Sequence, residues 1–265
     1  MYATTARLVD RLSSGTYDAD VLGWASPVPF FGRLEHATVA TIGINPSNRE
    51  FVDSTGSELG EADRRLPTLA SLGIEAWSAA SASDVRRIAR SCHGYFEANP
   101  YRLWFDVLDR MLRFGGASYY SDSFACHLDL VPFATSVKWG ALNKGTTRSL
   151  VIEGVRTMAE LLRDSSIGLI ILNGRAVVSA FEALAETTLK ASDVGDWTLP
   201  RKQGRGVQGF SYTGSIRSMA GVDFDHTIRV FGYNHNLQSS FGVTNQVVRR
   251  IGARVGEEIA RNQTR

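Results

Sequence analysis

Short, continuous runs of apolar residues alternate along this chain with longer stretches in which apolar residues recur at helical spacing. The continuous runs predict strands at 38–44, 123–131, 167–172 and 226–233. The helical spacing predicts helices near 4–14, over 101–114, from about 147 to 163, over 173–186 and at the C-terminus. Fully apolar strands separated by helices are typical of a parallel sheet covered on both faces. We therefore predict an α/β fold: a three-layer α/β/α sandwich around a central, mainly parallel four-stranded sheet.

The chain has 265 residues, 43% of them hydrophobic, which is enough to bury a sizeable core. Polar and loop-forming residues dominate 45–64 and 191–226, and we predict that both segments are loop insertions at the edge of the sheet. No internal repeat or linker-like stretch divides the sequence. We therefore expect one domain that spans residues 1–265.

Composition excludes several classes of protein. No apolar run approaches the roughly 20 residues that a membrane span needs, and the N-terminus lacks the charged-then-apolar order of a signal peptide, so we expect a cytoplasmic protein. Cys92 and Cys126 are too few for a disulfide framework or a four-thiolate metal site, and we expect both to be buried. The formal charge of +2 neither requires nor excludes a nucleic-acid partner.

Ligands of parallel sheets bind beyond the carboxyl ends of the strands, so the residues that follow each apolar run carry the candidate chemistry. These segments read GINPSNREF, HLDLVPFAT, LNGRAV and GYNHNLQSS, and none is a glycine-rich phosphate loop. Pro46 favours an extended backbone at Asn45, which would present the Asn45 amide rigidly at the end of a strand. The other interpretation of Asn-Pro-Ser is a simple turn initiator.

The three motifs GINPS, DLVPFAT and NHNLQSS, in this order at successive strand ends, resemble the uracil-DNA glycosylase superfamily. The resemblance is to its mismatch-specific and single-strand-selective branches and covers roughly residues 37–255. It implies that a nucleotide is flipped out of DNA and that water cuts the bond between base and sugar. By match to the first motif, Asn45 would hold the water. By match to the last, His235 would donate a hydrogen bond to the base, although the register there is open between His235, Asn234 and Asn236.

The resemblance also implies contacts to DNA. Pro46, Ser47 and Phe51 would contact the flipped base, with Phe51 stacking on its ring. Asn236, Leu237, Gln238, Ser239 and Ser240 would contact the DNA, and the loop from Leu237 to Phe241 would form an apolar wedge in the duplex where the base left. Asn173 either contacts a phosphate or merely starts a helix.

Asp129 stands where uracil-directed members of the superfamily carry an asparagine. An ionised aspartate only accepts hydrogen bonds, so Asp129 would repel a uracil carbonyl and accept from the amino group of cytosine. The alternative is that Asp129 pairs with an arginine or caps a turn. Because removal of ordinary cytosine would destroy the host genome, we favour a modified cytosine, glucosylated hydroxymethylcytosine of phage DNA.

The sequence thus predicts a monofunctional DNA glycosylase that acts as a monomer on DNA and leaves an abasic site. No lysine lies in a motif position where it would form a Schiff base, and the mechanism needs no metal or organic cofactor. Three alternatives stay open: a uracil or mismatch repair enzyme, a catalytically silent nucleic-acid-binding protein of the same fold, and a small-molecule nucleosidase.

Overall fold

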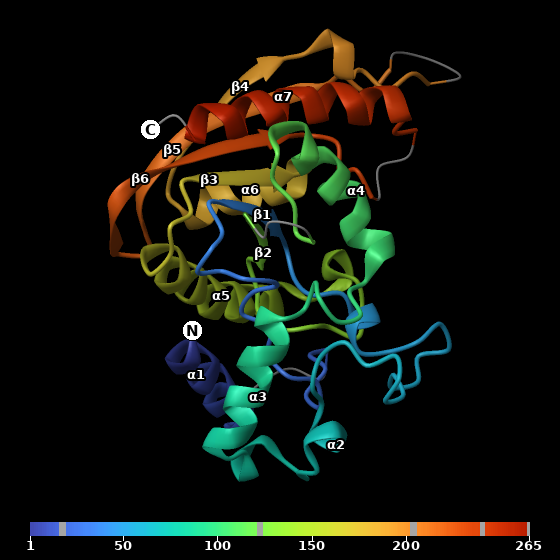
Figure 1. Ribbon diagram of the computed structural model, residues 1–265, viewed down its shortest axis with the longest axis vertical. Coiled ribbons are helices and arrows are strands. Elements are labelled where there is room, and N and C mark those ends of the chain that lie inside the picture. The colour runs from blue at the N-terminus through green and yellow to red at the C-terminus, as the bar shows by residue number, and fades with distance from the viewer. Residues whose placement is uncertain (16–19, 121–123, 202–205, 239–241, 264–265) are drawn as a thin grey trace.

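The computed structural model describes residues 1–15, 20–120, 124–201, 206–238 and 242–263. Within these residues, six strands form one mixed sheet in the order β2-β1-β3-β6-β5-β4 (Figure 1). The strands are β1 (Val39–Gly43), β2 (Ala125–Asp129), β3 (Leu169–Asn173), β4 (Lys190–Asp193), β5 (Phe210–Met219) and β6 (Val222–Tyr233). Strands β2, β1, β3 and β6 are parallel, whereas β5 and β4 extend the sheet antiparallel. The α/β class predicted from the sequence is confirmed.

Helices cover both faces of this sheet. Arg229 of β6 pairs with Glu258 of α7 (Asn245–Gln263), while a Cβ added to Gly232 of the same strand would lie 3.0 Å from Val178 of α6 (Arg175–Leu184). Since residues at odd and even positions of a strand point to opposite faces, α7 and α6 lie on opposite sides of β6. The helices are α1 (Tyr2–Ser13), α2 (Leu69–Leu72), α3 (Ala82–His93), α4 (Arg102–Leu112), α5 (Lys144–Arg163), α6 (Arg175–Leu184) and α7 (Asn245–Gln263).

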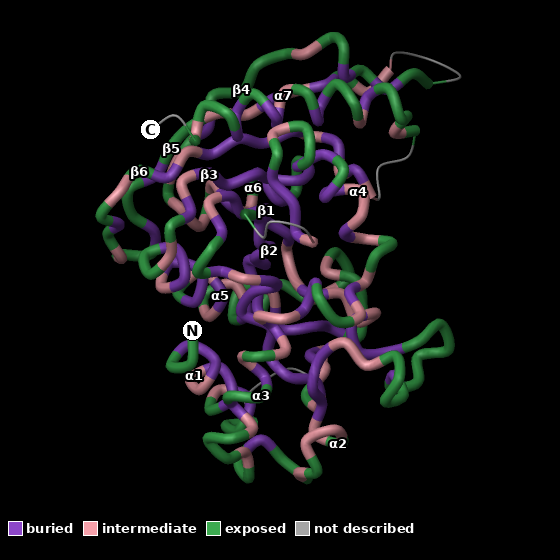
Figure 2. The backbone as a smooth tube through the Cα atoms, viewed as in Figure 1, coloured by how far each residue is buried: buried purple, intermediate pink, exposed green. Residues whose placement is uncertain are grey.

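The central strands form the core of the molecule, as the buried segments in Figure 2 show. All five residues of β1, β2 and β3 are buried, which explains their continuous apolar runs. Cys92 and Cys126 are buried and free, as predicted, and burial raises the pKa of both thiols. No helix in the described ranges combines the length and the apolar character needed to cross a membrane.

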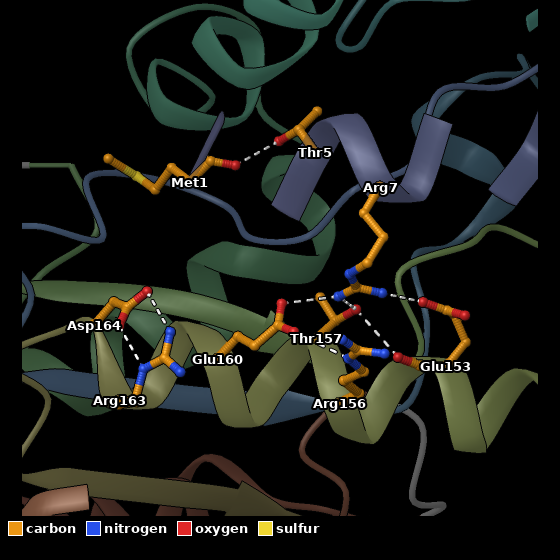
Figure 3. Close-up of polar contacts among 9 residues, drawn as sticks. All are labelled: Met1, Thr5, Arg7, Glu153, Arg156, Thr157, Glu160, Arg163 and Asp164. Carbon is orange, nitrogen blue, oxygen red and sulfur yellow. Dashed lines mark hydrogen bonds and ion pairs between the residues drawn. The ribbon is translucent and has the colours of Figure 1, made fainter. Parts of the chain in front are cut away.

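Arg7 of helix α1 bonds three side chains of α5 (Figure 3), and Arg11 of α1 lies 3.7 Å from Glu153 of α5. The guanidinium of Arg7 donates to Glu153, to Thr157 Oγ1 at 3.0 Å and to Glu160 at 2.9 Å. These three acceptors lie on one face of α5 at positions i, i+4 and i+7. Arg7 therefore joins the N-terminal helix to the helix that packs beside the sheet.

Two parts of the predicted architecture need correction. The sheet has six strands rather than four, because the predicted edge insertion 191–226 contains β5, most of β4 and the start of β6. That segment does lie at the sheet edge, but as antiparallel strands: β4 is fully exposed, and polar residues alternate with apolar ones along β5. The segment 45–64 is mostly loop, as predicted. Its regular structure is a short 3-10 helix, Asn48–Glu50, and an isolated bridge between Val52 and Glu58.

Candidate active site

A cavity of about 520 Å³ opens at the carboxyl ends of β1, β2 and β3. The end of β1 contributes Gly43 to Ser47, β2 contributes His127 and Asp129, and β3 contributes Asn173. The other walls are Phe31, Glu50, the start of α6, and the aromatic side chains Tyr101, Trp104 and Phe105 around α4. Polar groups of three parallel strands thus face one enclosed space, as expected for the ligand site of such a sheet.

Asn45 is held by its amide nitrogen. Its Nδ2 donates to Thr135 Oγ1 at 3.1 Å, to the Pro46 carbonyl at 3.2 Å and to the Phe133 carbonyl at 3.5 Å. The Thr135 hydroxyl donates to the Val137 carbonyl, so its oxygen accepts from Asn45. Because all three neighbours accept, the amide must turn its NH₂ group toward them. Its carbonyl oxygen has no hydrogen-bond partner within the described ranges and is available to accept from a water molecule.

Asp129 ends a buried chain of hydrogen bonds. His127 Nε2 lies 3.3 Å from Asp129 Oδ1, and His127 Nδ1 lies 2.7 Å from Thr41 Oγ1, which also bonds Tyr119. An ionised carboxylate only accepts, so with Asp129 ionised the hydrogen sits on Nε2 and Nδ1 accepts from Thr41. The chain orients the Asp129 carboxylate at the cavity wall, where its side chain is 4% exposed.

Gly43 allows this arrangement. It pairs with Asp129 across β1 and β2, and a Cβ at Gly43 would lie 2.2 Å from Asp129 Oδ1 and 2.9 Å from His127 Nε2. Any other residue here would displace both side chains. The glycine before the Asn-Pro motif is therefore required by the close approach of Asp129 rather than by a turn.

Asn173 lies at the end of β3, where it fixes the loop that follows β6. Its Oδ1 accepts from the Leu237 backbone N–H at 3.1 Å, and its Nδ2 donates to Gln238 Oε1 at 2.6 Å. Gly174, with φ of +101°, then starts α6 beside the cavity. Asn173 lines the cavity as a buried structural residue, and Arg175, one residue after Gly174, adds an exposed cation.

Glu50 is a second carboxyl group on the cavity wall. Its side chain accepts a hydrogen bond from the Tyr95 hydroxyl at 2.5 Å, and Tyr95 in turn accepts from the Tyr101 backbone N–H at 2.8 Å. Glu50 is 2% exposed, and burial raises its pKa to about 8. The group is therefore largely un-ionised at neutral pH.

The structure corrects the predicted role of His235. His235 is 2% exposed and does not line the cavity, and its Nε2 donates to the Trp197 carbonyl at 2.7 Å. Burial lowers its pKa. Its neighbours Asn234 and Asn236 line the cavity instead, but the Asn234 amide is already bonded to Phe210 and Gln208.

Two further predicted contacts are also wrong in their placement. Phe51 does not line the cavity; it is 1% exposed and packs edge-on against Trp24, with ring centroids 6.2 Å apart. Leu237, the first residue of the predicted wedge loop, is 7% exposed and thus buried, and Phe241, its last residue, lies outside the described residues. Gln238 is half-buried and bonded to Asn173 and Trp104. Ser239 and Ser240 lie outside the described residues.

The structure brings together around the cavity Asn45, Pro46, Ser47, Asp129, Asn173 and Asn236, and the roles assigned to them from the sequence stay predictions. The sequence analysis missed His127, Glu50 and the aromatic wall of Tyr101 and Trp104. A signal for His127 was present: it lies two residues before Asp129 on a strand, and residues two apart share a face.

Comparison with known proteins does not extend this description: no protein-family model and no curated protein sequence matches the chain.

Proposed function

We propose that this protein is a monofunctional DNA glycosylase of the uracil-DNA glycosylase type that hydrolytically excises a modified cytosine. One observation carries the proposal: the open carbonyl oxygen of Asn45 and the carboxylate of Asp129 face the same cavity from the ends of neighbouring parallel strands. Base excision by water requires one group that can hold a water and one that can read the base, set near each other in one pocket.

In the proposed mechanism, the base leaves with the electron pair of its bond to the sugar, and positive charge develops on C1′. The Asn45 oxygen orients a water toward that carbon, and the lock on its amide nitrogen keeps the water in one position. Asp129 accepts a hydrogen bond from the exocyclic amino group of the base. A uracil carbonyl in that position would be repelled by the carboxylate.

The size of the cavity supports a substituted base. At about 520 Å³ it lies within the range of pockets that hold a whole small-molecule ligand, about 300–1,000 Å³. A bare pyrimidine is smaller than such ligands, so the cavity favours a cytosine that carries a further group on its ring. Glucosylated hydroxymethylcytosine of phage DNA is our favoured target. In that role the protein would act as a cytoplasmic monomer in defence against phage.

DNA contacts are assigned to the rim of the cavity. The N-terminus of α6 and the exposed guanidinium of Arg175 suit a backbone phosphate. Leu237 is buried and is therefore not placed to fill the gap left by the flipped base. Leu103 of α4 is 82% exposed and lies between the cavity-lining residues Tyr101 and Trp104, which makes it our candidate for that wedge.

The test is base release, measured by mass spectrometry, from matched DNAs that carry uracil, cytosine, hydroxymethylcytosine or glucosylated hydroxymethylcytosine. We expect the wild type to release only the glucosylated base, and Asn45→Ala to release it at least about 100-fold more slowly. Asp129→Asn should lose about tenfold or more of the preference for cytosine-type bases. Asn48→Ala, a half-buried asparagine of the same loop that does not line the cavity, is the matched control.

The position of His235 favours a second candidate, a nucleic-acid-binding protein without glycosylase activity. His235 is bonded to Trp197, so it does not supply the hydrogen bond to the base that the superfamily motif implies. If the wild type releases no base from any of the four DNAs yet binds them with an affinity that falls steeply with salt, this second function replaces the first. Release of uracil would instead indicate repair.

A further inference from the structure

Glu50 is the one carboxyl group of the cavity wall that the mechanism above leaves without a role. It ends the short 3-10 helix Asn48–Glu50, five residues after Asn45, and it lines the same cavity as Asp129. The Tyr95 hydroxyl is the one hydrogen-bond donor to its side chain in the described ranges. Tyr95 also accepts a hydrogen bond from the backbone of Tyr101 at the start of α4. Through Tyr95, the Glu50 side chain is therefore linked to the segment that begins α4.

The charges that face Glu50 come from several elements. Burial is the largest influence and raises its pKa, while the hydrogen bond from Tyr95 and the cation of Arg65 lower it. The charge of Asp129, across the cavity, raises it again. Asp129 itself accepts from His127, so the two carboxyl groups differ in role. Asp129 is placed to accept a hydrogen bond from a base, and Glu50 carries a proton that it can donate.

Cytosine needs such a proton more than uracil does. When the bond to C1′ breaks, its electron pair passes to the base. Uracil spreads that charge over two carbonyl groups, whereas cytosine has one carbonyl and a basic ring nitrogen. A cytosine-type base therefore leaves readily only if an acid protonates its ring as the bond breaks.

We infer that Glu50 is the general acid of this site, which protonates a departing cytosine-type base while Asp129 holds its amino group. The inference rests on the proposed function. The bond between C1′ and the base breaks, the base takes the electron pair and the Glu50 proton, and the water oxygen bonds C1′. The proton that this water loses restores Glu50, so the sum is hydrolysis of the base from the sugar.

The experiment is the single-turnover rate of base release between pH 5 and pH 9.5, for the wild type, Glu50→Gln, Tyr95→Phe and the exposed-loop control Glu61→Gln. For the wild type we expect a rate that falls above about pH 8, where Glu50 ionises. Glu50→Gln should be about 100-fold slower or more, and its rate should no longer fall in that range. Binding to a DNA whose target sugar carries fluorine, which blocks cleavage, should change by less than threefold.

Tyr95→Phe gives an independent readout if Glu50→Gln fails to fold. The Tyr95 hydrogen bond favours the ionised form of Glu50, so its removal should move the alkaline fall in rate to higher pH. A merely structural Tyr95 would lower the rate at every pH without moving that fall.

The outcomes separate this inference from the proposed function. Base release by the wild type with an unchanged rate and pH profile in Glu50→Gln would overturn the role of Glu50 and leave the glycosylase standing. An unmoved alkaline fall in Tyr95→Phe would also overturn it. Absence of release by the wild type from every DNA would remove both.

Discussion

Glu50 is held un-ionised inside the protein, and this has a consequence for stability that needs no substrate. The unfolded chain ionises this carboxyl near its ordinary pKa of 4.5, whereas the folded protein keeps the proton until about pH 8. Between these values the folded state binds one proton more than the unfolded state. The free energy of unfolding must therefore decrease as pH rises through this window, by about 1.4 kcal/mol per pH unit from this group.

The prediction concerns Glu50→Gln, which keeps the acceptor for Tyr95 but cannot ionise. The free energy of unfolding of both proteins is measured with urea at pH 5 and at pH 8. The difference between variant and wild type should be about 3–4 kcal/mol more in favour of the variant at pH 8 than at pH 5. The sign follows because the wild type alone loses stability as Glu50 is forced to release its proton. Glu61→Gln, exposed in the same loop, should show the wild-type dependence. If the free energy of unfolding changed equally with pH in Glu50→Gln and in the wild type, Glu50 would already be ionised in the folded protein.

The sequence located some site residues because local rules fix them. Asn45 follows a buried strand and precedes proline, and Asp129 ends the neighbouring strand, so both were placed at one sheet edge. His235 also follows a strand, but the direction of its ring depends on the carbonyl of Trp197, 38 residues away. Phe51 likewise turns inward to meet Trp24. Such choices between a cavity and the core depend on tertiary contacts that no local pattern encodes.

At the scale of elements, buried strands were easier to predict than exposed ones. β1, β2 and β3 are buried at every residue and read as apolar runs, whereas β4 is fully exposed and carries no such signal. Helix α3 was missed even though a signal existed. Ser81 and Asp84 form a capping box at its start, a pattern of small polar and acidic residues that marks helix N-termini.

Helix α4 carries the next prediction. If Leu103 fills the space left by a flipped base, Leu103→Ala should slow base release from duplex DNA by about tenfold and leave single-stranded substrate almost unaffected, because only a duplex must be unstacked. Ile152→Ala, which removes an exposed side chain of α5, is the matched control and should change neither rate. Equal loss on both substrates would assign Leu103 to another role, and no loss would exclude it as the wedge.

At the scale of the whole molecule, helices α1 and α3 lie together below the sheet in Figure 1, and Arg7 joins this part of the molecule to α5. The sequence predicted both helices that Arg7 connects but not the connection. Its three acceptors, Glu153, Thr157 and Glu160, are recognisable only once α1 is known to cross that face of α5.

This connection gives the last prediction. Arg7→Ala should lower the free energy of unfolding by about 1–3 kcal/mol, because it removes the charge-assisted bonds of a half-buried guanidinium to two glutamates. Arg11 remains beside Glu153 and Arg156 beside Glu160, so neither carboxylate is left without a cation. Thermal unfolding should shift by several degrees. Arg156→Ala removes only an exposed pair with Glu160, one turn apart on α5, and should cost at most about 0.5 kcal/mol. Base release at low temperature should be unchanged in both variants, since neither arginine lines the cavity. A similar cost for the two variants would show that Arg7 acts as an ordinary surface charge.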